Sequence, residues 1–429
     1  MRDPRRDVPG TDRVLADPAI AAAIENLGHR LVKRTAQQVQ QRARDGELDP
    51  SRVVAETLAA LPDSPSSVRA VVNATGVLLH TNLGRAPLSD PARDALLRAA
   101  GTTDVELDLH TGKRGTRGAA TIAALREAVP AAEAAHVVNN GAAALALAAT
   151  ALAAGGEIVL ARGELVEIGD GFRIPDLLTS TGARLREVGT TNRVRLDDYR
   201  AALGEQTGFV LKVHPSNFVI SGFTAAVPAA SLRELDAPVV VDIGSGLLEP
   251  DSALPDEPDA HTALADGADL VIASGDKLLG GPQCGLLLGR AQLIERLRKH
   301  PLARALRVDK LTLAALEATV RGPRPPTARA LHADPARLLR RARALAEQLT
   351  AAGLPATAVE SEATAGGGGA PGALLPSAAV ALPERFAKHL RLGDPPVLAR
   401  LERDRCLLDL AAVPEECDET LRRAALAAG

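Results

Sequence analysis

Aromatic residues and cysteines are scarce in this chain of 429 residues. Phe, Tyr and Trp together make up 1% of the sequence and Trp is absent, so the core has to be built from Leu, Val, Ile and Ala. Three cysteines occur, Cys284, Cys406 and Cys417, and they show no C-x-x-C spacing. This pattern argues against a zinc site or a disulfide framework, and it predicts a protein of the reducing cytoplasm.

A targeting signal, a membrane span and a strong charge bias are missing as well. The opening residues MRDPRRDVPG contain no apolar signal core, and no run of about 18 apolar residues predicts a membrane span. The formal net charge of −3 excludes a generally basic protein, so any RNA site must be a local patch. The length, with 46% apolar and 24% charged residues, predicts a globular protein of two or three domains.

The stretch VIASGDKLLGGPQCG, residues 271–285, is the most informative motif. An apolar strand expected over residues 269–273 runs into Ser274, Asp276 and Lys277, and the glycines that follow allow a ligand to approach the backbone. A lysine in a poorly solvated pocket loses its proton readily and can form a Schiff base with an aldehyde cofactor. Taken alone, a lysine after a strand could equally be a solvated surface residue. Cys284 is expected to be a small buried thiol.

A second apolar strand, APVVVDIGSG at residues 237–246, contains Asp242. Asp242 precedes Lys277 by 35 residues, which leaves room for one crossover between neighbouring parallel strands. Pyridoxal 5′-phosphate needs a carboxylate beside its ring nitrogen to keep the ring an effective electron sink. Asp242 alone could cap a strand end, but together with Lys277 it indicates a pyridoxal-phosphate site.

The phosphate of such a cofactor has a candidate site within residues 136–156. This segment predicts a short strand, a glycine turn and an alanine-rich helix. Free N–H groups at the helix start, at Asn140, Gly141 and Ala142, suit an anion, and Ser274 could add a hydroxyl contact. The order of phosphate helix, carboxylate and lysine is that of the aspartate aminotransferase-like, fold type I pyridoxal enzymes. The expected fold class is therefore α/β.

Distinctive segments are spread along the chain from about residue 70 almost to its end. They are VVNATGVLLHTNLGRAPLS (71–89), ELDLHTGKRGTRG (106–118), ARGELVEIGDGFRIPDLL (161–178), REVGTTNRVRLDDY (186–199), LKVHPSNFVISGFT (211–224), SGDKLLGGPQCG (274–285) and GGGGAPGALLPS (366–377). In these segments the chain resembles the bacterial L-seryl-tRNA(Sec) selenium transferase (selenocysteine synthase) family. One local departure is Ala411, where the resemblance leads us to expect a basic residue.

This resemblance implies a pyridoxal-phosphate-dependent reaction on seryl-tRNA(Sec), in which the serine hydroxyl is eliminated and selenium from selenophosphate adds to the β-carbon. Lys277 would bind the cofactor and take the Cα proton, while Asp242 would hold the ring nitrogen. Because hydroxide is a poor leaving group, an acid is needed, and Asp276 is a candidate. No metal is expected.

The resemblance also implies an arginine site for the selenophosphate anion, made by Arg85, Arg304 and Arg307. Arginine suits this role because it makes bidentate contacts to phosphate-like oxygens. Arg304 and Arg307 are three residues apart and are expected to share one helix face. Each arginine could instead form a structural salt bridge. The family further implies a homo-oligomer, at least a dimer, with larger rings of dimers expected.

Three domains are expected. They are an N-terminal helical domain at residues 1–65, a large pyridoxal-phosphate-binding α/β domain at 66–330 and a small C-terminal α+β domain at 331–429. In the first, Ile20, Ile24, Leu27 and Leu31 recur at helical spacing after Asp17-Pro18, and a second helix is expected over residues 51–61. In the second, strands at 157–161, 209–213, 239–242 and 269–273 call for a parallel sheet with helices on both faces. A Gly-rich loop at 366–369 is expected inside the third.

The N-terminal region carries a local basic patch. Between residues 30 and 44 lie five basic residues and no acidic one, namely Arg30, Lys33, Arg34, Arg42 and Arg44. These could form an ordinary solvated helix face, but the family resemblance implies that this domain binds the tRNA. The competing hypotheses are a pyridoxal lyase or ammonia-lyase acting on a small amino acid or amino-sugar acid, and a non-catalytic tRNA-binding protein. Lys277 and Asp242 together argue against the latter.

Overall fold

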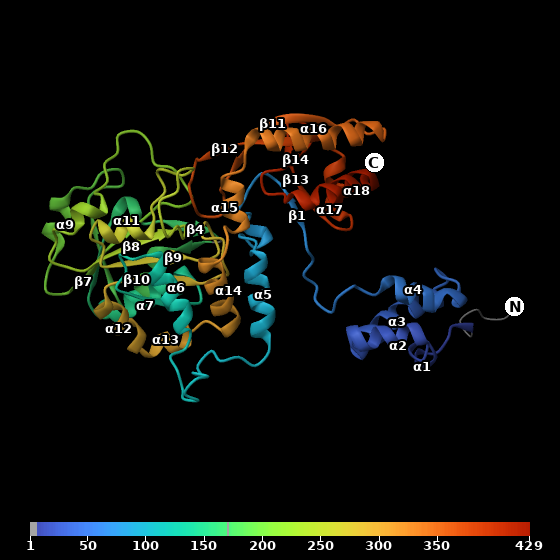
Figure 1. The fold of residues 1–429 in the computed structure, drawn as a ribbon, viewed down its shortest axis with the longest axis horizontal. Coiled ribbons are helices and arrows are strands. Elements are labelled where there is room, and N and C mark those ends of the chain that lie inside the picture. Colours follow the sequence, from blue (N-terminus) through green and yellow to red (C-terminus); the bar gives the residue numbers. More distant parts are fainter. Residues whose placement is uncertain (1–6, 170) are drawn as a thin grey trace. The chain divides into compact units, whose positions relative to one another are not determined.

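The structure, a computed structural model, describes residues 7–169 and 171–429 (Figure 1). The chain divides into two compact units, with the boundary between Ala70 and Val71. Within the residues described, no helix is both long enough and apolar enough to cross a lipid bilayer.

The first unit is a small helical bundle. Its helices are α1 (Thr11–Leu15), α2 (Pro18–Leu27), α3 (His29–Arg44) and α4 (Val53–Ala60), the last preceded by a 3₁₀ turn at Pro50–Arg52. Asp17 begins α2 as predicted, because its carboxylate accepts hydrogen bonds from the N–H groups of Ala19 and Ile20. The apolar spacing that continues to Leu31 does not mark one helix, since Gly28 has a φ of 83° and separates α2 from α3.

The second unit is built around a seven-stranded sheet. Its strands are β2 (Ala134–Val138), β3 (Glu157–Ala161), β6 (Arg184–Val188), β7 (Thr207–Val213), β8 (Val239–Gly244), β9 (Leu270–Ser274) and β10 (Gly285–Gly289). They lie in the order β2-β10-β9-β8-β7-β3-β6. The expected parallel sheet is correct for β6, β3, β7, β8 and β9, but β10 runs antiparallel to both β9 and β2. A short connection from β9 reverses the chain, which makes an antiparallel neighbour possible without a crossover.

Helices cover both faces of this sheet (Figure 1). One face packs against α7 (Gly141–Ala153), α8 (Ile174–Ser180), α12 (Ala291–Lys299) and α13 (Pro301–Ala305). The other packs against α6 (Ala119–Ala128), α9 (Leu196–Ala202), α10 (Ala229–Leu232), α11 (Ala260–Ala265) and α14 (Lys310–Arg321). With aromatic side chains so scarce, both layers are filled mainly by Leu, Val, Ile and Ala, as the composition predicts. A hairpin of β4 (Glu167–Gly169) and β5 (Phe172–Arg173) lies outside the large sheet.

A second, five-stranded sheet holds the C-terminal region. Its strands are β1 (Val72–Ala74), β11 (Thr357–Thr364), β12 (Leu374–Pro383), β13 (Val397–Glu402) and β14 (Arg405–Asp409), in the order β1-β13-β14-β12-β11. The neighbouring helices are α15 (Pro326–Leu331), α16 (Pro335–Ala351), α17 (Phe386–Leu392) and α18 (Asp418–Ala428), whereas α5 (Asp90–Ala100) packs against α14. The strand β1 comes from the start of the second unit, pairs in parallel with β13 and so ties the two ends of that unit together.

One partly buried histidine gives the large sheet a pH-dependent stability. His136 lies on β2, and desolvation together with the nearby positive charge of Arg298 lowers its pKa from 6.5 to about 4. The unfolded chain therefore takes up a proton at a higher pH than the folded chain does. As pH falls from 6.5 to 4, we expect the free energy of unfolding to decrease by about 3 kcal/mol from this group alone.

The replacement His136→Leu should remove that part of the acid sensitivity. Urea unfolding at pH 7 and at pH 4.5 would measure it, with His389→Leu as the control, because His389 is exposed on α17. If His136→Leu loses as much stability between these two pH values as the unchanged protein, then His136 is not a source of the acid sensitivity.

Candidate functional site

Lys277 lies in a tight turn directly after β9. The turn is closed by three backbone hydrogen bonds, from Gly275 N–H to Cys284 O (2.9 Å), from Gly281 N–H to Gly275 O (2.9 Å) and from Leu278 N–H to Ser245 O (2.8 Å). The last of these joins the turn to the loop after β8. Lys277 is buried, with 7% of its surface exposed, so its side chain is held inside the protein rather than in solvent.

The surroundings of Lys277 favour its neutral, nucleophilic form. Desolvation lowers the pKa of this amine, and the positive charge of Arg85 lowers it further. The negative charges of Asp242, Asp276 and Glu257 oppose this shift without cancelling it. A lysine whose pKa is lowered by burial can attack an aldehyde, which supports the role predicted from the sequence.

Asp242 lies on β8, the strand parallel to β9, and pairs in register with Ile272. The two strands are adjacent, so the separation of 35 positions between Asp242 and Lys277 does span a single crossover. Asp242 is partly exposed as a residue, but protein closely surrounds its carboxyl group. Desolvation raises its pKa from 3.8 to about 6, although Lys277 and the N–H of Gly244 oppose the shift. A positively charged ring nitrogen would supply the counter-charge that this carboxylate needs.

Arg85 and Asp276 form an ion pair beside Lys277. Arg85 Nη1 lies 2.7 Å from Asp276 Oδ2, and the N–H of Ala86 donates to the carbonyl of Asp276 at 3.3 Å. Arg85 has a φ of 63°, in the left-handed region that residues with a side chain rarely adopt. Such strain is typical of functional sites. In this arrangement Asp276 accepts a hydrogen bond from Arg85. An acid that protonates the leaving hydroxyl has to donate a proton, so this contact does not directly support that role for Asp276.

The predicted phosphate site lies at the start of α7, which follows β2 as the sequence led us to expect. The helix begins at Gly141, and Asn140 caps it by accepting the N–H of Ala143 at 2.8 Å. A Cβ atom added to Gly141 would lie 2.8 Å from the hydroxyl of Ser274, so that hydroxyl lies directly beside the helix terminus. The N–H groups of Gly141 and Ala142 and this hydroxyl can all donate to a phosphate.

The residues present therefore fit pyridoxal phosphate. A buried amine follows β9, a desolvated carboxylate lies on the neighbouring strand β8, and the N-terminus of α7 lies beside a serine hydroxyl at the end of β9. Cys284 is a free, buried thiol in the wall of the turn, and burial raises its pKa to about 12. In the part of the chain that the structure describes, no cluster of three or more His, Cys, Asp or Glu side chains could hold a metal ion.

The expectation that Arg304 and Arg307 share one helix face is wrong. The helix α13 ends at Ala305, and Leu306 already has a φ of −91° and a ψ of 8°. Arg307 lies beyond the helix, forms an isolated β-bridge with Val138 at the end of β2, and its Nη1 atom lies 3.7 Å from Glu106 Oε1. Spacing alone could not show this, because Pro301 starts a helix only five residues long.

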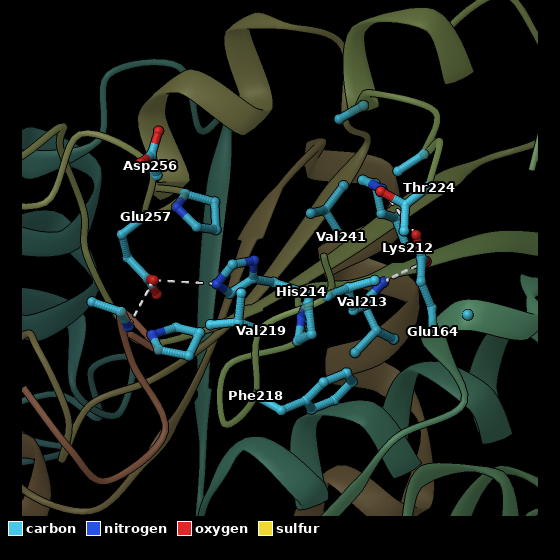
Figure 2. A pocket seen from close by; sticks show the side chains of 18 of the residues that line it. Glu164, Lys212, Val213, His214, Phe218, Val219, Thr224, Val241, Asp256 and Glu257 are labelled. Carbon is cyan, nitrogen blue, oxygen red and sulfur yellow. Dashed lines mark hydrogen bonds and ion pairs between the residues drawn. The ribbon is translucent and has the colours of Figure 1, made fainter. Parts of the chain in front are cut away.

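The unit that contains Lys277 also has a cavity of about 1210 Å³ (Figure 2). It lies at the ends of β3, β7 and β8, and its wall includes Glu164, Lys212, His214, Phe218 and Glu257. None of the residues predicted from the sequence lines it. Lys212 is occupied by an ion pair with Glu164 at 2.9 Å, which makes it a poor competitor for the role of Lys277.

Sequence reasoning missed His214 and Glu257. His214 follows β7, and its Nε2 atom lies 3.2 Å from Glu257 Oε2. Figure 2 shows the two side chains facing each other across the cavity wall. The signal for His214 was its position after an apolar strand, within a segment quoted only for its family resemblance. Glu257 had no signal, because LPDEPD reads as an ordinary surface loop.

Comparisons with known proteins found similarities along almost the whole chain. A family model described as L-seryl-tRNA selenium transferase matches residues 71–414, and one described as selenocysteine synthase N terminal matches residues 5–44. The L-seryl-tRNA(Sec) selenium transferase of Carboxydothermus hydrogenoformans is 40% identical over 442 residues, covering 96% of this chain and 95% of that protein. The protein of the same name from Moorella thermoacetica is 47% identical over 386 residues, covering 83% and 81%.

A solved structure shares the fold. D-Glucosaminate-6-phosphate ammonia-lyase has a TM-score of 0.59 and 20% identity, and the likeness covers 83% of this chain and 96% of that one. At this identity the likeness shows the fold alone. Together with the sheet order, it confirms the predicted fold type I architecture.

Proposed function

Because the chain belongs to the L-seryl-tRNA selenium transferase family, whose members are pyridoxal-phosphate-dependent, we propose that it converts seryl-tRNA(Sec) to selenocysteyl-tRNA(Sec) with selenophosphate as selenium donor. The single observation that carries the proposal is the buried Lys277 beside the strand that carries Asp242, in a chain similar to selenium transferases over almost its whole length. A cytoplasmic location fits an enzyme that acts on tRNA.

The proposed roles follow from where each side chain lies. Lys277 would bind the cofactor and would take up the proton that leaves the serine Cα, and its lowered pKa favours the neutral amine that both roles require. Bound pyridoxal phosphate supplies an electron sink. Asp242 pairs with the ring nitrogen, and the N–H groups of Gly141 and Ala142, with Asn140 and Ser274, hold the phosphate. Asp276 holds Arg85 in place and stays the candidate acid for loss of the hydroxyl.

The arginines give a first test of the selenium-donor site. Replacing Arg85, Arg304 or Arg307 by Ala should raise the selenophosphate concentration needed for half-maximal rate by about 10- to 100-fold, the cost of losing one charge-assisted contact. Affinity for seryl-tRNA(Sec) should stay nearly unchanged. Arg93→Ala is the control, because Arg93 is exposed and pairs with Asp90 on α5. Loss of tRNA affinity with donor use intact would contradict the assignment.

The first unit carries the proposed tRNA site. A hollow of about 850 Å³ on this unit is lined by His29, Arg30, Lys33, Arg34 and Gln37, among others. The side chains of Arg30, Lys33 and Arg34 are exposed, and no acidic residue among those that the structure describes lines the hollow. Lys and Arg side chains in such a surface neutralise phosphates and release counterions. We therefore propose that α3 contacts the tRNA backbone.

Replacing Arg30, Lys33 and Arg34 together by Ala should weaken binding of tRNA(Sec) by at least about tenfold. A plot of the logarithm of the binding constant against the logarithm of the salt concentration should also become less steep, by about two in its slope. Binding across a salt series measures both. The matched control replaces Arg385, Lys388 and Arg391, which are exposed on or beside α17. Equal losses in the two triple variants would mean that the effect is one of net charge and not of this surface.

The assembly is a further part of the proposal. We propose a homo-oligomer, at least a dimer, because fold type I enzymes generally complete each active site across a dimer interface. Larger rings of dimers are the expectation that the family carries. Light scattering of the purified protein measures this directly.

A conversion assay tests the function itself. The protein with pyridoxal phosphate, seryl-tRNA(Sec) and selenophosphate should yield selenocysteyl-tRNA(Sec), whereas free L-serine and D-glucosaminate 6-phosphate should not be consumed. The small-molecule lyase is not favoured, because the lyase structure is only 20% identical whereas selenium transferases reach 40–47%. Consumption of a small substrate without conversion of the tRNA would reverse that judgement.

A further inference from the structure

The Gly-rich segment at residues 366–370 lies against Lys277, although the sequence suggested only a loop within the small domain. A Cβ atom added to Gly368 would lie 2.9 Å from Lys277 Nζ, and one added to Gly369 would lie 3.0 Å from the side chain of Leu278. The backbone at Gly368 therefore packs directly against the end of the Lys277 side chain.

Glycines give this segment its left-handed backbone, but its last residue, Ala370, has no such preference. Gly366, Gly367 and Gly368 have φ values of 70°, 48° and 89°, and Ala370 has a φ of 47°. For Ala370, which has a Cβ atom, the left-handed region is unfavourable. Ala370 is also buried, at 9% exposure. A contact from outside the segment must therefore hold this residue in place.

Glu257 supplies such a contact (Figure 2). Its Oε2 atom accepts the N–H of Ala370 at 2.7 Å and lies 3.2 Å from Nε2 of His214. The backbone N–H of His214 in turn donates to the carbonyl of Asp242 at 2.9 Å. One carboxylate oxygen thus links the segment over Lys277 to the end of the strand that carries Asp242.

Glu257 also places a carboxylate inside the protein, close enough to affect Lys277. The side chain is 2% exposed, and within the residues described its Oε1 atom is buried without a hydrogen-bond partner. A buried carboxylate is costly, and a neutral amide could accept the same bond from Ala370. The charges that act on Lys277 are those of Asp242, Arg85, Asp276 and Glu257, so the carboxylate also contributes to the electrostatics of the lysine.

We propose that Glu257 is a positioning residue, which holds residues 366–370 closed over Lys277 through Ala370 and supplies part of the negative charge that Lys277 senses. This role is separate from binding of tRNA or of the selenium donor. It rests on the proposed site only in taking Lys277 as the residue that binds the cofactor.

Hydrogen exchange on the full-length protein tests the positioning role, with and without pyridoxal phosphate. In Glu257→Ala the peptide that contains residues 366–370 should exchange at least tenfold faster than in the unchanged protein. In Glu257→Gln it should exchange within about twofold, because the amide oxygen still accepts from Ala370. The matched control is Asp256→Ala, since Asp256 is the exposed neighbour in the same loop. An unchanged rate in Glu257→Ala, or an equal rise in Asp256→Ala, would overturn the proposal.

The charge is tested by the pH dependence of the reaction between the cofactor-free protein and pyridoxal phosphate. The negative charge of Glu257 raises the pKa of Lys277, so Glu257→Gln should move the midpoint of this dependence to lower pH. If Glu257→Ala does not fold, the measurement on Glu257→Gln tests the proposal by itself. An unmoved midpoint in Glu257→Gln would overturn the proposal. Neither hydrogen exchange nor the reaction with pyridoxal phosphate requires tRNA or selenium donor. A negative result in these two experiments would therefore not contradict the proposed reaction, and a negative conversion assay would not contradict the role of Glu257.

Discussion

Lys277→Ala is expected to abolish formation of selenocysteyl-tRNA(Sec), with a loss of roughly 10⁴-fold or more. The variant loses both the amine that binds the cofactor and the base for the Cα proton, and residues that act as a unit in catalysis have losses of this size. Single-turnover conversion of seryl-tRNA(Sec) measures the effect. The variant should still fold, since removing a buried amine of lowered pKa leaves the hydrogen bonds that close the turn in place.

Lys299→Ala is the matched control, because Lys299 is exposed on α12 and pairs only with Glu295 in the structure described. It should keep full activity. Residual activity of Lys277→Ala within about tenfold of the unchanged protein would show that another group binds the cofactor or moves the proton.

Asp242→Ala is expected to reduce conversion by roughly 10²- to 10³-fold while some cofactor stays bound. The phosphate contacts at the start of α7 and the bond to Lys277 remain, but the counter-charge for the ring nitrogen is lost. In the unchanged protein without cofactor, the pKa of Asp242 is about 6. Below that pH the carboxyl group is protonated and cannot pair with a charged ring nitrogen, so cofactor affinity should decrease as pH falls through 6.

Asp242→Asn separates these effects, since it keeps the shape of the side chain but does not titrate. Its cofactor affinity should be weaker at pH 8 and should lack the part of the pH dependence that comes from residue 242. Cofactor titrations of both proteins between pH 5 and pH 8 measure this. Full activity of Asp242→Ala would contradict the role at the ring nitrogen.

Much of the large domain could be predicted because its signals are local. The strands β3, β7, β8 and β9 are continuous apolar runs, which is typical of strands buried on both faces. The direction of β10 was missed, since Gly285–Gly289 is as apolar as its neighbours and carries no mark of orientation. The pairing of β1 with β13 was missed as well, because it joins residues more than 300 positions apart.

The site residues likewise differ in whether a local sequence pattern points to them. Lys277, Asp242 and Gly141 each follow or lie in a strand or start a helix, so short motifs point to them. Their assembly at one end of the sheet follows from the α/β topology. Glu257 and the segment at 366–370 reach the site from loops, whose paths depend on tertiary contacts that no periodicity encodes. The arginines show the same limit, since family likeness pointed to Arg307 but could not show that α13 ends before it.

The most direct test of the account is to locate the lysine that binds the cofactor. The purified protein, loaded with pyridoxal phosphate, is reduced with borohydride, digested and analysed by mass spectrometry. The account predicts that the reduced cofactor is found on Lys277, in the peptide that contains SGDKLLGG, and that Lys277→Ala carries no specific label. A label on Lys212 or Lys310 in the unchanged protein would contradict it.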